Sequence, residues 1–91
     1  MADNKDKRSI YNRLHRIQGQ INAIENMIDD DKSCEDLLIQ INAAKSALHK
    51  LGQMVLEEHI KQSLAKGVKK GNAGDALDRF EKELDLFSRM G

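Results

Sequence analysis

Apolar residues recur along the first third of the chain at alternating steps of four and three. The series is Ile10, Leu14, Ile17, Ile21, Ile24 and Ile28. This spacing is a heptad seam, and it predicts an amphipathic helix that begins near Lys5 and ends in the acidic run 29–31. Gly19 lies inside the predicted helix, where a glycine costs about 1 kcal/mol relative to alanine. A close approach of another backbone would explain this glycine, and simple tolerance would explain it equally well.

A second and longer seam follows the acidic run. Ser33 is a good N-cap with Asp36 three residues later, which predicts that a helix starts here. We expect it to reach about Lys66, before Gly67, which makes a helix of about 50 Å. The basic stretch 67–71 is then predicted to be a connector. The apolar positions of this helix are Leu37, Leu38, Ile41, Ala44, Leu48, Leu51 and Val55.

A third amphipathic segment closes the chain. Asn72 can cap it, with Asp75 at the third position of the helix. Its apolar face is formed by Leu77, Phe80, Leu84 and Phe87. There is no proline to interrupt any of the three helices. The pattern therefore predicts an all-α chain with one domain over residues 1–91, in which residues 1–6 form a flexible N-terminal arm. A chain this short buries only a modest core alone, so its long apolar stripes predict self-association.

The charge of the chain bears on whether the protein binds nucleic acid. The formal net charge is zero, which does not suggest a nucleic-acid-binding protein. The charge is nevertheless arranged in alternating blocks of +3 over 1–20, −5 over 25–36, +4 over 45–70 and −2 over 75–89. An assembly of several copies could separate these blocks into basic and acidic surfaces, whereas the simpler interpretation is that helix surfaces are charged.

The chain's start and its single cysteine indicate a compartment. Residues 1–10 are polar and charged, so neither a signal peptide nor a membrane segment is predicted. Cys34 has no second cysteine with which to form an internal disulfide. We therefore expect a cytoplasmic protein. The sequence shows no Ser-His-Asp arrangement, phosphate-binding glycine loop or paired catalytic carboxylates, so we do not expect an enzyme.

Two reactive side chains lie at opposite ends of the second predicted helix. Cys34 and His59 are 25 residues apart, which is about 37 Å along a helix. They cannot share a ligand on one straight helix. Two copies packed antiparallel about a point between Ser46 and Ala47 would bring Cys34 of one chain beside His59 of the other, twice by symmetry. The alternative is that Cys34 is only a small buried hydrophobe and His59 a partly buried polar residue.

Three stretches of the chain resemble the CsoR/RcnR family of bacterial transcriptional repressors. The first is Arg13-Leu14-His15-Arg16-Ile17-Gln18-Gly19-Gln20, the second is Cys34, and the third is Leu56-Glu57-Glu58-His59-Ile60. The resemblance extends from about Lys7 to Phe87. It implies a three-helix protomer, a dimer built as an antiparallel four-helix bundle, and a disc-shaped tetramer of two dimers. It also implies that operator DNA binds on a flat basic face and is released by an effector bound between subunits.

The resemblance carries the effector site over to Cys34 and His59, contributed by opposite protomers. The third family position is Ser63, a poor ligand for a soft cation. The leading hypothesis is a metal-sensing repressor that binds Cu(I), or another transition metal ion, with an incomplete ligand set. Residues 1–5 lack the His or Cys that nickel and cobalt sensors use. One alternative is a repressor that senses formaldehyde or another electrophile through Cys34, with the amine of Ala2. The other is a structural helical oligomer that binds no DNA.

The resemblance also suggests DNA contacts. Arg13 matches a basic family position, and Lys50 stands where some members have arginine. Arg16, Gln18 and Lys45 are predicted to lie on the same face. A lysine supplies a point charge rather than a bidentate fork, so Lys50 is expected to contact phosphate without reading bases. A solvated helix surface is the alternative for each of these residues.

Overall fold

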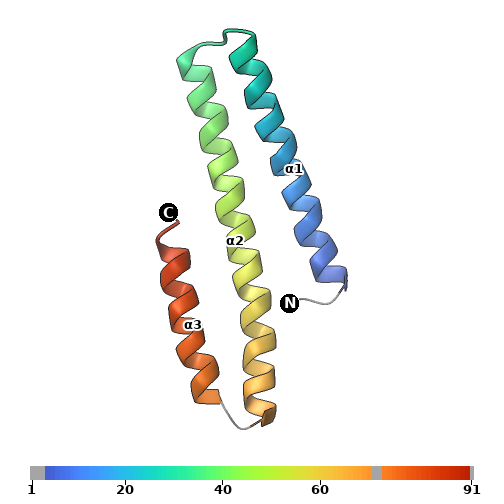
Figure 1. Ribbon diagram of the computed structural model, residues 1–91, viewed down its shortest axis with the longest axis vertical. Helices are drawn as coiled ribbons and strands as arrows, with labels where there is room; N and C mark the ends of the chain where they lie inside the picture. Colours follow the sequence, from blue (N-terminus) through green and yellow to red (C-terminus); the bar gives the residue numbers. More distant parts are fainter. Residues whose placement is uncertain (1–3, 71–72, 91) are drawn as a thin grey trace.

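The computed structural model describes residues 4–70 and 73–90, and within them it is all-α, as predicted. Helix α1 spans Asn4–Asp29, α2 spans Cys34–Lys70 and α3 spans Ala73–Ser88. Figure 1 shows α2 in the middle, with α1 along one side and α3 along the other. Residues 4–6 of the expected N-terminal arm belong to α1, and residues 1–3 lie outside the described residues.

The turn between α1 and α2 is fixed by local hydrogen bonds. The N–H of Lys32 donates to the carbonyl of Met27 and the N–H of Asp31 donates to that of Ile28, which is the Schellman arrangement of a helix end. Asp31 has a φ of 56°, a left-handed conformation that aspartate tolerates better than most residues. The Ser33 hydroxyl accepts a hydrogen bond from the N–H of Asp36 at 3.1 Å, so the predicted N-cap is confirmed.

Helix α2 is longer than predicted. The expected end near Lys66 and the expected connector over 67–71 are wrong, because the helix continues to Lys70. A single helix-interior glycine such as Gly67 costs only about 1 kcal/mol, and without a proline nothing stops the helix. Helix α3 begins at Ala73 with Asp75 in its first turn, as expected, and its proposed cap Asn72 lies outside the described residues.

The three helices form a single layer. The Cα atoms extend over 58 × 27 × 12 Å, and their radius of gyration is 17.3 Å, against about 12 Å for a compact domain of this length. Helix α2 packs against both other helices, whereas α1 and α3 are not in contact in the described part of the chain. Among the described side chains only Ile17 and Ala44 are buried. The protomer therefore has almost no core of its own.

One side of this layer is apolar and open. A recess of about 670 Å³ lies between α2 and α3, and another of about 460 Å³ lies between α1 and α2. Leu48 and Met90 line both recesses, so the two are continuous. Leu48 remains 43% exposed and Ile41 46% exposed. We call this surface the open apolar face, formed by Ile21, Ile24, Ile41, Leu48, Val55, Leu86 and Met90. None of the described helices is long and apolar enough to cross a membrane.

The open apolar face predicts the effect of one substitution on assembly. We expect Leu48→Glu to shift the protein from an oligomer to a less stable monomer, because association would bury an unpaired carboxylate at a cost of several kcal/mol. Light scattering coupled to size exclusion measures the mass. Leu77→Glu, at an exposed α3 leucine outside this face, is the control and should retain at least the dimer. An unchanged mass for Leu48→Glu would contradict association through this face.

Candidate functional site

Cys34 is the first residue of α2. It directly follows the Ser33 cap, and its side chain is exposed. Counting along α2 in steps of seven from Cys34 leads to Ile41, Leu48 and Val55, so these residues share one side of the helix. Cys34 therefore lies at one end of the open apolar face, where its thiol is accessible to a partner.

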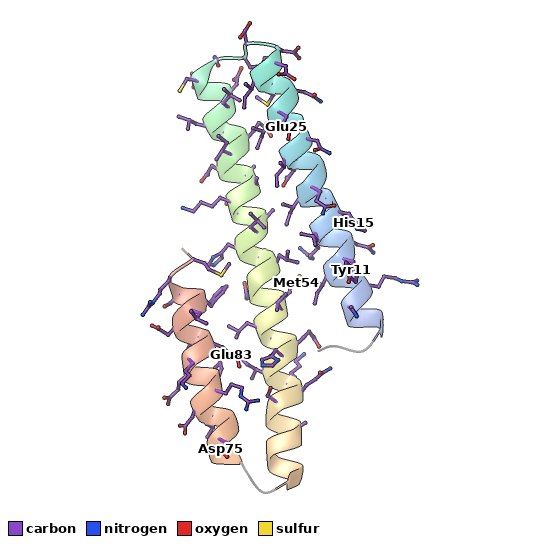
Figure 2. The ribbon with its side chains drawn as sticks, viewed as in Figure 1. Tyr11, His15, Glu25, Met54, Asp75 and Glu83 are labelled. Atoms are coloured by element: carbon purple, nitrogen blue, oxygen red, sulfur yellow. The ribbon has the colours of Figure 1, made fainter. Side chains whose placement is uncertain are left out.

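His59 lies near the other end of the same face. It lines the recess between α2 and α3 and follows Val55 by one turn. Its Nε2 is 3.0 Å from Oε1 of Glu83 on α3, and Figure 2 shows Glu83 on the side of α3 next to α2. The side chains of His59 and Glu83 are 39% and 21% exposed, so the pair is partly shielded from water.

The contact with Glu83 assigns the two ring nitrogens of His59. An ionised carboxylate only accepts hydrogen bonds, so Nε2 must carry the hydrogen and donate it. The neutral ring then keeps a lone pair on Nδ1, which is free to act as a ligand. The hydroxyl oxygen of Ser63 lies 3.4 Å from the same Nε2. Ser63 is thus associated with the nitrogen that contacts Glu83 rather than with the available one.

Sequence reasoning missed Glu83. It lies 24 residues from His59 on another helix, so no local spacing links the two. The available signal was the apolar series of α3, since Glu83 falls between Phe80 and Phe87 on the side that the series turns toward α2. A polar residue on an otherwise apolar face needs a partner, and His59 is that partner.

One protomer alone does not assemble a site from Cys34 and His59. They belong to opposite ends of α2, and no group of three or more His, Cys, Asp or Glu side chains in the described residues is placed to hold a metal ion. Both residues do lie along the open apolar face, which is the surface that a second protomer would cover.

The five predicted DNA contacts stay a prediction, and α1 and α2 distribute them around more than one side of the layer. Lys45 lies among apolar residues of the open apolar face. Lys45 and Lys50 are five residues apart and so project about 140° apart around α2, and Gln18 and Arg16 project about 160° apart around α1. All of these side chains are exposed.

Three of the five do lie on a common side of the layer. Met54 and Ser9 line a small recess between α1 and α2. Lys50 precedes Met54 by one turn, and Arg13 follows Ser9 by one turn, so both flank this recess. Arg16 comes almost one further turn along α1. Arg13, Arg16 and Lys50 therefore form a basic group on the side opposite the open apolar face, exposed to solvent, and Glu57 and Glu58 line the recess that Arg13 and Lys50 flank.

Comparison with known proteins identifies relatives along almost the entire chain. Residues 6–87 match the family described as metal-sensitive transcriptional repressor. The chain is 36% identical over 86 residues to the copper-sensing transcriptional repressor CsoR of Bacillus subtilis, covering 94% of this chain and 82% of that protein. It is 37% identical over 70 residues to the copper-sensing transcriptional repressor RicR of Mycobacterium tuberculosis, covering 77% and 73%.

The fold is shared with solved structures of two regulators. The copper-sensing repressor CsoR with Cu(I) from Geobacillus thermodenitrificans NG80-2 superimposes with a TM-score of 0.85 at 30% identity, covering 97% of this chain and 92% of that one. The nickel-responsive transcriptional regulator InrS gives a TM-score of 0.80 at 29% identity, covering 88% and 90%. The resemblance in the sequence is thus confirmed, and the chain belongs to the family of metal-sensitive transcriptional repressors.

Proposed function

We propose that this protein is a homo-oligomeric repressor that binds operator DNA and releases it when Cu(I) binds between Cys34 of one protomer and His59 of its partner. The observation that carries the proposal is that both residues lie along the open apolar face, at opposite ends of α2. An antiparallel pairing of two such faces, centred between Ser46 and Ala47, buries the exposed leucines and isoleucines. The same pairing brings the two donors together twice.

The donor set favours Cu(I) over other metal ions. A thiolate and an imidazole are soft to intermediate donors that suit Cu(I), which is stable with few ligands. Zn²⁺ is almost always four-coordinate in proteins, whereas the described part of one protomer brings no three His, Cys, Asp or Glu side chains together around an ion. The Ser63 hydroxyl is near Nε2 of His59 and is a poor donor for a soft ion. The copper-sensing relatives CsoR and RicR support this assignment.

His59 connects the proposed site to α3. With Nε2–H donated to Glu83, the ring has a fixed orientation, and Nδ1 is available for the ion. A cation at Nδ1 withdraws electron density from the ring, so Nε2–H becomes a stronger donor. The α2–α3 contact is then strengthened when the site is filled, and in this way effector binding acts on the position of α3.

The basic group of Arg13, Arg16 and Lys50 is proposed to contact the DNA backbone. These exposed cations lie on the side of the layer that the paired protomers leave free. Their long side chains supply the electrostatic part of binding, which depends on salt because counterions are released from the DNA. Sequence selectivity then has to come from polar contacts with base edges and from DNA shape.

Removal of either donor tests the effector site. We expect Cys34→Ala and His59→Gln each to bind operator DNA like the unmodified protein but to remain bound when Cu(I) is added, because one donor alone cannot hold the ion. Fluorescence anisotropy of a labelled duplex measures both properties. Ser63→Ala is the matched control and should still release DNA. Release of DNA by Cu(I) in both donor variants would contradict the site.

Glu83 tests the assignment of the ring nitrogens. We expect Glu83→Gln to lower Cu(I) affinity by roughly 10- to 100-fold, because a neutral amide orients and polarises the imidazole less strongly than a carboxylate. Competition with a Cu(I) chelator measures the affinity. Glu81→Gln, at an exposed acid on the same helix, should leave it unchanged. Equal affinities of the two variants would show that Glu83 does not support the site.

Lys50 tests the DNA-binding side. We expect Lys50→Gln to weaken binding by a similar factor for operator and random duplexes, because it removes a phosphate contact. The slope of log K against log salt concentration should decrease in magnitude by about 1. Lys82→Gln, at an exposed lysine of α3, serves as the control. The proposed DNA-binding side would be contradicted if the slope of log K against log salt concentration were unchanged in Lys50→Gln. It would also be contradicted if the slope were reduced equally in both variants.

A further inference from the structure

Gly19 has no packing role within the protomer. It lies in the interior of α1 and is exposed, and a Cβ built on it would meet no atom of the described residues within 4 Å. Gly52 on α2 differs, because a Cβ there would lie 2.7 Å from Cε of Met90. A glycine destabilises a helix interior relative to alanine. The contacts described within the protomer do not require a glycine at position 19. The close approach of a binding partner would explain why this position has no side chain.

Gly19 lies on the side of α1 that faces away from α2. Ile17, which is 3% exposed, marks the side in contact with α2, and Gly19 projects about 160° away from it. We define the outward strip as the exposed residues that share this orientation: Arg8, Asn12, His15, Gly19, Asn22, Ala23 and Asn26. At one end of the strip the rings of Tyr11 and His15 stack with centroids 6.2 Å apart, and Figure 2 labels both on α1.

The net positive charge of residues 7–24 favours a polyanion as the binding partner. From Lys7 to Ile24 the sequence contains four Lys or Arg residues and no Asp or Glu. Lys7, Arg8, Tyr11, Asn12 and His15 line a shallow recess of about 640 Å³ on the helix surface. Arg8 is the cation of the strip itself, and Lys7 lies beside it in this recess. The other side chains of the strip are mostly neutral hydrogen-bonding groups, which together with these cations are a set that proteins use against phosphate and sugar.

A second copy of this chain is a poorer occupant of the strip. The core of a protein interface is apolar and depleted in charge, and the one aliphatic group of the outward strip is the methyl of Ala23. The apolar surface available for association lies elsewhere, on the open apolar face. Charge complementarity and the absence of an apolar core therefore both favour nucleic acid.

We propose that duplex DNA runs along the outward strip of α1, and that Gly19 is the point where the DNA backbone approaches the helix most closely. This inference rests on the proposed function and adds a contact surface next to the basic group of Arg13, Arg16 and Lys50. Asn12, His15 and Asn22 donate to phosphate or sugar oxygens on both sides of Gly19. A side chain at position 19 would hold the DNA away from these donors.

Substitution of Gly19 tests the proposal, because its effect on DNA affinity can be measured separately from its effect on folding stability. We expect Gly19→Ala to lower the affinity for a labelled duplex from upstream of the protein's own coding sequence by about tenfold, the effect of roughly one lost hydrogen bond. Gly19→Gln should lower it further, because the longer side chain displaces more of the DNA. The melting temperature should be unchanged or higher, because both residues are better helix formers than glycine. Oligomer mass and Cu(I) affinity should not change.

Gly74→Ala is the matched control. Gly74 is an exposed helical glycine of α3, and a Cβ there also meets nothing within 4 Å. This variant should bind DNA like the unmodified protein. Full affinity in both Gly19 variants would overturn the inference and leave the proposed function intact. A changed oligomer mass in Gly19→Ala would overturn it in favour of a subunit contact. If the unmodified protein bound no duplex above random DNA, the proposed function itself would fail, and this inference with it.

Discussion

A single layer of three helices cannot bury its own apolar residues, and this constraint governs the molecule. Stable domains are built from at least two packed layers around a core. This protomer exposes 6924 Å², whereas a compact folded monomer of 10.3 kDa exposes about 5,400 Å². The excess accompanies large apolar side chains that stay exposed on all three helices, among them Ile21, Leu48 and Leu84. Under the proposed function the missing layer comes from another copy, and the seam on α2 repeats with the period that suits helix pairing.

The same constraint determines where an effector can act. Cys34 continues the series of Ile41, Leu48 and Val55 that needs a partner, and His59 follows at its far end. Under the proposed function, the surface that holds the protomers together is also the surface that holds the ion. A site with one donor from each protomer exists only in the assembly. Any ion bound there adds its binding free energy to the stability of the paired state, by mass action.

Much of the fold could be predicted because it follows from local rules. Heptad spacing gave α1, and the Ser33 cap gave the start of α2. The end of α2 was wrong because the small cost of Gly67 is less than the helix preference of the residues around it. Glu83 was missed because its contact with His59 depends on how α3 packs against α2, which no local spacing records. The grouping of Lys45 and Gln18 with Arg13 and Lys50 came from the family resemblance, and residues carried over in this way need not project from the same side of a helix.

Helix α2 is the physical link between the two activities proposed for this protein. It is the one helix of the described chain that contacts both of the others, and α1 and α3 do not touch. The proposed effector site lies on one side of α2, joined to α3 through His59 and Glu83. The basic group lies on the opposite side: Lys50 belongs to α2 itself, and Arg13 and Arg16 are joined to α2 through the packing of α1. A signal from one to the other has no direct route through side chains that bypasses this helix. Under the proposed function, a change in the α2–α3 contact therefore reaches the basic group only through α2 and its packing with α1.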